Sequence, residues 1–216
     1  MKYDVDLFFS KNCPTNFFFD NTYTYIRVGY ADQWHIDDRD FEYNTDLFAL
    51  LLDSNEKLSN ESDIVFFNNL TNKEKTALLL GDCSSQAGCW ISSGQMRCSA
   101  NDVDLNLKEM PQRVQKIAFI VNVYECNDAK RKTLWGNQCY FYIRKQEKFG
   151  TCKGEMPIVI AGKVEWKGRN HDQTIGKLCE LIRTESGWKL QMVQCESSEK
   201  KLADYLNSFT YNPIFK

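Results

Sequence analysis

The sequence predicts an all-β fold, most simply a sandwich of two sheets. Its apolar residues gather in short runs rich in β-branched and aromatic side chains, and turn-forming residues separate these runs. Many short strands with turn signals between them are typical of sandwiches. The runs place strands at residues 22–28, 47–52, 64–67, 116–124, 139–144, 157–164, 178–183 and 188–193.

The clearest pair of strands lies within residues 44–69. Residues 47–52 (LFALLL) are continuously apolar, and residues 64–67 (IVFF) are β-branched and aromatic. Strands of this composition are expected to be buried on both faces or nearly so. Asp53 and the two residues after it supply turn chemistry between the runs.

One segment near the end of the chain has a different period. Leu202, Leu206 and Phe209 are spaced at helical intervals among lysines and acidic residues. This spacing predicts a short amphipathic helix over residues 199–209 that lies against the sheet.

Composition limits the classes of function. The chain has 216 residues, 43% of them hydrophobic, which suffices for one sizeable core in a single domain. The net charge of −2 comes with no basic stripe, so nucleic acid is not an expected partner. No apolar run approaches the ~20 residues of a membrane span. The opening MKYDVDLFFSK has acidic residues where a secretion signal is basic, so we expect a cytoplasmic protein.

The cysteine pattern argues against structural zinc. The chain has nine cysteines, an odd number, and none of them forms a C-x-x-C pair. Structural zinc sites usually draw their ligands from such pairs, and only His35 and His171 could add nitrogen ligands.

Seven of the nine cysteines fall into two groups by their surroundings. One group lies in or beside apolar runs, where cysteine commonly behaves as a small buried hydrophobe. The other lies in a Ser/Gly-rich polar loop, where a thiol could be exposed and oxidisable. The first group is Cys126, Cys139, Cys179 and Cys195, and the second is Cys83, Cys89 and Cys98.

Five blocks in a fixed order carry a family resemblance. Residues 44–69 combine an apolar strand, a turn and a strand ending in F-F-N-N, and Gly81-Asp82 follows. Residues 105–121 (LNLKEMPQRVQKIAFIV) read as strand, turn and strand, and NVYEC continues them. Residues 180–193 contain E-L-I-R and then G-W-K. In this order the blocks resemble the TerD family of tellurium-resistance and stress proteins over roughly residues 25–209.

The resemblance implies a single TerD-like β-sandwich domain over residues 1–216 with a short C-terminal helix. It also implies a strand at residues 72–80, although NKEKTALLL contains good helix formers. Residues 1–21 do not match the family pattern. We expect them to form an N-terminal extension or an extra edge strand.

The resemblance also implies a calcium site, built from an opening D-x-D, the G-D-N and an acidic G-D-D-E run. Here the D-x-D is replaced by Glu42 and Asn44, and Cys83 replaces the asparagine of G-D-N. The acidic run falls on residues 99–101, which carry no charge. Calcium takes six to eight oxygen ligands, several of them charged, so we expect calcium binding to be weak or lost. The candidate ligands are Glu42, Asn44, Asp46, Asp82, Asn101 and Asp102, with Asp104 close by.

Two functions remain open at this point. No G-x-S-x-G elbow, P-loop, dinucleotide-binding or H-E-x-x-H motif is present, so no catalytic residue and no enzymatic activity are predicted. The first hypothesis is a non-catalytic stress-response binding protein with a degenerate calcium site and protein partners. The alternative is a redox or metalloid-binding protein that uses the soft thiolates of Cys83, Cys89 and Cys98.

Overall fold

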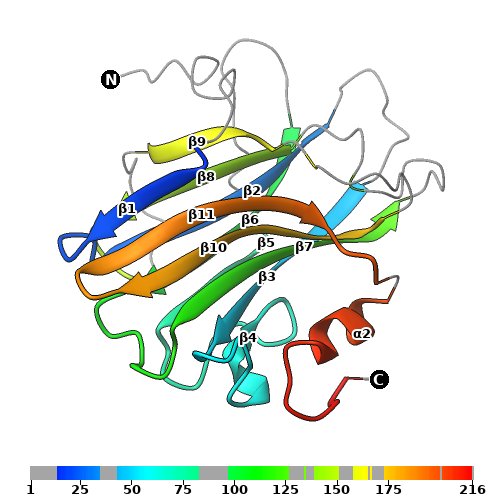
Figure 1. The fold of residues 1–216 in the computed structure, drawn as a ribbon. Helices are drawn as coiled ribbons and strands as arrows, with labels where there is room; N and C mark the ends of the chain where they lie inside the picture. Colours follow the sequence, from blue (N-terminus) through cyan, green and yellow to red (C-terminus); the bar gives the residue numbers. More distant parts are fainter. Residues whose placement is uncertain are drawn as a thin grey trace.

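The computed structural model describes residues 14–34, 43–82, 97–126, 134, 139–150, 158–164, 166, 173–199 and 201–215. In this part of the chain two antiparallel sheets pack face to face (Figure 1). The all-β sandwich prediction is therefore confirmed. One sheet has the order β1 (Asn16–Asp20), β11 (Gly187–Glu196), β10 (Ile175–Thr184), β7 (Lys116–Cys126), β3 (Tyr43–Leu52) and β4 (Ile64–Val65). The other has the order β5 (Ala77–Asp82), β6 (Arg97–Asn106), β2 (Tyr25–Trp34), β8 (Cys139–Gln146) and β9 (Ile158–Val164).

The main core lies between the two sheets. Successive strand residues point to opposite faces, so every second residue of each strand enters this core. On β3 these residues are Leu47, Ala49 and Leu51, and Phe119 of β7 packs with them. From the other sheet, β2 and β6 contribute the inward-facing side chains Ile26, Val28, Tyr30, Val103 and Leu105.

A second, smaller core covers the opposite face of β3. Phe48, Leu50 and Leu52 pack there with Leu206 of the helix α2 (Leu202–Asn207) and with Phe209. Figure 1 shows α2 beside this sheet. The continuous apolar run of β3 is explained because both of its faces are covered, and the prediction of two-sided burial is confirmed for residues 47–52.

The second strand of this pair is shorter than predicted. β4 ends at Val65, and Phe66 and Asn69 then exchange backbone hydrogen bonds of 3.0 and 2.9 Å across a tight turn. Phe67 lies at the tip of that turn and is 50% exposed. The predicted strand ran to residue 67 because residues 66 and 67 are apolar, but the strand itself ends at Val65.

The helix also covers less of the chain than the predicted 199–209. It has six residues, and the chain after it folds back on its last turn. Asn207 Oδ1 accepts hydrogen bonds from the backbone N–H groups of Ile214 and Phe215 at 2.8 and 2.9 Å. This side chain therefore holds the C-terminal segment against the second core.

Residues 72–80 are only partly a strand. β5 begins at Ala77, and residues 72–76 form a turn in which Lys75 has a φ of 57°. The side chain of Asn72 organises this turn, because Oδ1 accepts the backbone N–H groups of Thr76 and Ala77 at 2.8 and 2.9 Å. This side chain closes the turn between Thr71 and Leu78, which form an isolated antiparallel bridge.

The expected extra edge strand is present as β1, whereas β2 and β6 differ from the predicted strands in where they begin. β1 pairs with β11 and lies at the edge of its sheet, and Asp20 then caps a turn by accepting the N–H of Thr22 at 2.9 Å. That turn delays the start of β2 to Tyr25. Most of β6 was missed, because its polar residues 97–104 show no apolar alternation.

Candidate functional site

The strands that carry the candidate calcium ligands meet at one end of the sandwich. Asp82 of β5 pairs with Asn101 of β6 in the sheet register. Across the gap between the sheets, Asn101 Nδ2 donates a hydrogen bond of 2.6 Å to the backbone carbonyl of Thr45 on β3. Thr45 directly precedes the half-buried Asp46. Residues from all three parts of the family pattern are therefore brought to the same end of the fold.

The other candidates are not all part of this arrangement. Glu42 lies outside the described residues. Asn44 is placed by its backbone, which pairs with Glu125 just before an irregularity in the β3–β7 register. Among the described residues, no group of three or more His, Cys, Asp or Glu side chains is arranged to hold a metal ion.

Asp102 points away from the other candidate ligands. Val103 and Leu105 enter the core between the sheets, so Asp102 and Asp104 face the outer side of the five-stranded sheet. There the Tyr142 hydroxyl donates a hydrogen bond to Asp102 Oδ1. Burial raises the pKa of Asp102, although this hydrogen bond and the charge of Arg27 oppose the rise.

Arg27 and Asp104 form a buried ion pair on the same outer face. Arg27 Nε and Nη2 lie 2.7 and 3.1 Å from the two carboxylate oxygens of Asp104, so the pair is bidentate. The backbone N–H of Gly150 donates a further 2.9 Å hydrogen bond to Asp104 Oδ2. Asp104 is 1% exposed and Arg27 is 7% exposed. These contacts engage the carboxylate of Asp104 in the ion pair.

Gly29 makes the contact between Tyr142 and Asp102 possible. Gly29 pairs with Asp102 on one side and with Tyr142 on the other, so it lies between them in the sheet. A Cβ atom at Gly29 would lie 2.1 Å from Tyr142 Cζ. The tyrosine ring therefore crosses the strand over the position where a side chain would otherwise stand.

Gly29→Ala is expected to lower the free energy of unfolding by about 1–3 kcal/mol, because the Tyr142 ring must move away from Asp102. Chemical denaturation of the variant and of the same change in a Tyr142→Ala background measures this effect. The cost should largely disappear in the second background, since the clash and the hydrogen bond are then both absent. An equal cost in both backgrounds would show that Tyr142 is not the cause.

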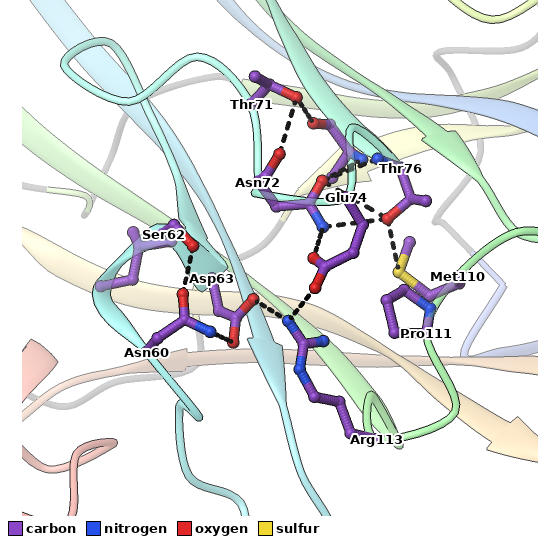
Figure 2. Close-up of polar contacts among 12 residues, drawn as sticks. Asn60, Ser62, Asp63, Thr71, Asn72, Glu74, Thr76, Met110, Pro111 and Arg113 are labelled. Carbon is purple, nitrogen blue, oxygen red and sulfur yellow. Dashed lines mark hydrogen bonds and ion pairs between the residues drawn. The ribbon is translucent and has the colours of Figure 1, made fainter.

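A second polar cluster joins two loops at the other end of β3 (Figure 2). Arg113 Nη2 donates to Asp63 Oδ1 at 2.8 Å and to Glu74 Oε1 at 3.0 Å. Asn72 Nδ2 donates to Glu74 Oε2 at 3.0 Å, which links this ion pair to the turn before β5. Burial raises the pKa of Asp63, although the charge of Arg113 opposes the rise.

Sequence reasoning missed both of these clusters. In each, a charged residue lies in a polar stretch that has no motif, and its partner is more than 30 positions away in the chain, as with Arg27 and Asp104 or Arg113 and Glu74. The sequence did contain one relevant pattern, because Asp102 and Asp104 alternate with the apolar Val103 and Leu105. This alternation indicates acids along one face of a strand, but it does not identify their partner.

The cysteine predictions have mixed outcomes. Cys139 and Cys179 are fully buried, as predicted. Cys195 is exposed, so the prediction of burial was wrong for it. It shares the outward-facing positions of β11 with Lys189 and Gln191, which are also exposed. The segment containing Cys83 and Cys89 lies outside the described residues, as do the side chains of Cys98 and Cys126.

Comparison with known proteins identifies the family. A family model described as the TerD domain matches residues 20–209. The tellurium resistance protein TerD of Serratia marcescens is 31% identical over 105 residues, which are 48% of this chain and 48% of that protein. The chain thus aligns with about half the length of this curated relative.

Two crystal structures were also matched. A protein of unknown function, SAV2460, has a TM-score of 0.46 at 14% identity, over 81% of this chain and 92% of its own. A homologue of the telluride resistance protein TerD from Streptomyces coelicolor A3(2) has a TM-score of 0.48 at 9% identity, over 82% of this chain and 91% of its own.

No helix in the described part of the chain reaches the length and apolar character of a membrane span. From the family-model match over residues 20–209, the chain belongs to the TerD family.

Proposed function

We propose that this chain is a non-catalytic, tellurium-resistance-type binding protein of a stress response, and that its calcium site has degenerated. The observation that carries this proposal is the 2.6 Å hydrogen bond from Asn101 Nδ2 to the Thr45 carbonyl. In the family pattern, an acidic residue stands where Asn101 stands here. A domain without the ion would act through its protein partners.

The hydrogen bond matters because of what it replaces. A carboxylate beside the Thr45 carbonyl would bring electron-rich oxygens together, and a cation between them would stabilise such a pair. The amide of Asn101 instead presents an N–H donor to the carbonyl. The two strands are thereby joined directly, and the contact needs no ion.

The remaining charges also favour weak binding. Asn44 and Asn101 are neutral, and the carboxylate of Asp102 is engaged on the other face by Tyr142. Of the candidate ligands, Asp46 and Asp82 are then the acids that the described strands bring to this end. Affinity in oxygen-lined sites falls steeply as charged ligands are lost.

Restoring the acids is expected to restore calcium binding. In the variant Asn44→Asp/Asn101→Asp, 1 mM calcium should raise the melting temperature by several degrees, because about 2.7 kcal/mol is gained at a hundredfold excess over Kd. The native chain should show little change when calcium is exchanged for a chelator. Differential scanning calorimetry of metal-stripped protein measures both.

The matched control is Asn16→Asp/Asn68→Asp, which adds the same charge at exposed positions on the edge strand and in the turn after β4. It should behave like the native chain. Strong stabilisation of the native chain at micromolar calcium would overturn the proposal. The absence of any gain in the restored variant would also count against it, since the strands would then not form the ion site.

A further inference from the structure

Two arginines stand directly opposite each other on the outer face of the five-stranded sheet. Arg27 of β2 is the register partner of Arg144 of β8. Side chains opposite each other in an antiparallel pair lie close together, and like charges there are destabilising. The charge of Arg27 is compensated by its bidentate pair with Asp104. The charge of Arg144 opposes the rise that burial causes in the pKa of Asp102 on the same face, but Arg144 has no such bidentate pair among the described residues.

Arg144 makes no ion pair within the part of the chain that the structure describes. Its guanidinium carbon lies 5.0 Å from the centre of the Tyr142 ring, which is a cation–π contact. Its Nε atom is buried and has no hydrogen-bond partner among the described residues. A guanidinium stays charged at all physiological pH values, so this donor cannot be silenced by losing a proton.

Gln146 adds a second unpaired donor on the same face. It follows Arg144 by two residues on β8, and the alternation that puts Phe141 and Ile143 in the core places both outside it. Gln146 is 6% exposed, and its Nε2 atom is buried with no partner among the described residues. Leaving a buried donor unpaired costs free energy. Two such donors on one face indicate that an acceptor binds beside them.

We propose that Arg144 and Gln146 form a binding site for a small oxyanion, a carboxylate or a phosphate group. Such a ligand carries acceptors for these donors and matches the planar fork of a guanidinium. Neither acid of this face makes an ion pair with Arg144, because Tyr142 hydrogen-bonds to Asp102 and Arg27 pairs with Asp104, although the charge of Arg144 still acts on Asp102. Arg144 as a whole is half-buried, whereas its Nε atom is buried.

The test is titration of the purified chain with sodium phosphate and, separately, with sodium acetate at constant ionic strength. Calorimetry gives the affinity for the native chain and for Arg144→Gln, Gln146→Leu and the control Lys189→Gln. The control removes one positive charge from an exposed position of the other sheet. Saturable binding is expected in the native chain and the control, about tenfold or more weaker in Arg144→Gln and several-fold weaker in Gln146→Leu. The stronger of the two probes identifies the chemical class.

A second measurement does not depend on the stability of the variants. In the native chain, the NMR resonances of the Arg144 Nε–H and the Gln146 side-chain amide should shift together and saturate with the same Kd. Absence of saturable binding of both anions to the native chain would overturn the site. Equal affinity in Arg144→Gln and Lys189→Gln, or anion-dependent shifts that leave Arg144 and Gln146 unchanged, would overturn it as well.

Discussion

Replacing Arg27 with leucine is expected to lower the free energy of unfolding by about 3–5 kcal/mol. Asp104 would keep the hydrogen bond from Gly150 but would lose both contacts with the guanidinium while remaining almost fully buried. A buried carboxylate without its counter-charge is far less stable than a solvated one. Equilibrium unfolding in urea, monitored by tryptophan fluorescence, measures the loss.

The double variant Arg27→Leu/Asp104→Leu is the decisive comparison. Removing both partners eliminates the uncompensated charge of Asp104, so the double variant should be more stable than Arg27→Leu alone; Asp102, 4.0 Å from Arg27, loses that neighbour in both variants. Lys189→Leu, at an exposed position, controls for the loss of one positive charge and should have little effect. If the double variant were as unstable as the single one, the shape of the Arg27 side chain rather than its charge would be the stabilising feature.

The second large effect is expected at Asn72, which is completely buried. Asn72→Ala would leave the backbone N–H groups of Thr76 and Ala77 without the acceptor that now lies within 2.9 Å of each. With about 1–3 kcal/mol for each buried donor left unpaired, the variant should lose roughly 2–5 kcal/mol. Figure 2 shows that the same side chain also contacts Glu74 and Thr76, so the turn before β5 should loosen.

Two further variants separate the causes of this loss. Asn72→Asp retains an acceptor oxygen for the two N–H groups but places a carboxylate beside Glu74, so its stability should lie between those of the native chain and Asn72→Ala. Asn68→Ala, in the exposed turn nearby, should be close to native. Hydrogen exchange of the Thr76 and Ala77 amides gives a local readout. Unchanged protection of these amides in Asn72→Ala would refute the proposed role of the side chain.

Local pattern was sufficient to predict most strands but not where they end. The apolar run 47–52 and the helical spacing of Leu202 and Leu206 predicted β3 and α2, because burial requires apolar side chains at the period of the element. The boundaries at Ala77 and Tyr25 depend on turns closed by Asn72 and Asp20, single polar side chains that bond to the backbone a few residues away. Such bonds compete with the strand ladder, and the apolar pattern does not register them.

For the candidate calcium ligands, too, the sequence predicted one part and the tertiary structure decided the other. The order of the blocks was enough to indicate the family and to show that the residues at 99–101 carry no charge. Position along the chain could not distinguish Asn101 from Asp102, because neighbouring residues of a strand point to opposite faces. Only the pairing of β6 with β2 and β5 shows that Asn101 reaches Thr45 while Asp102 reaches Tyr142.

The sequence by itself determined the β-rich class, the strand-forming runs and the family, since each of these is carried by local composition and by the order of short blocks. The tertiary structure alone decided which charges are paired. Arg27 meets Asp104 across 77 residues, and Arg113 meets Asp63 across 50. Sheet register sets the first of these contacts, and a shift of one residue in register would move every side chain of a strand to the other face. The contacts that neutralise the buried charges are therefore a property of the assembled sandwich, whereas the tendency to form its strands is already present in each segment.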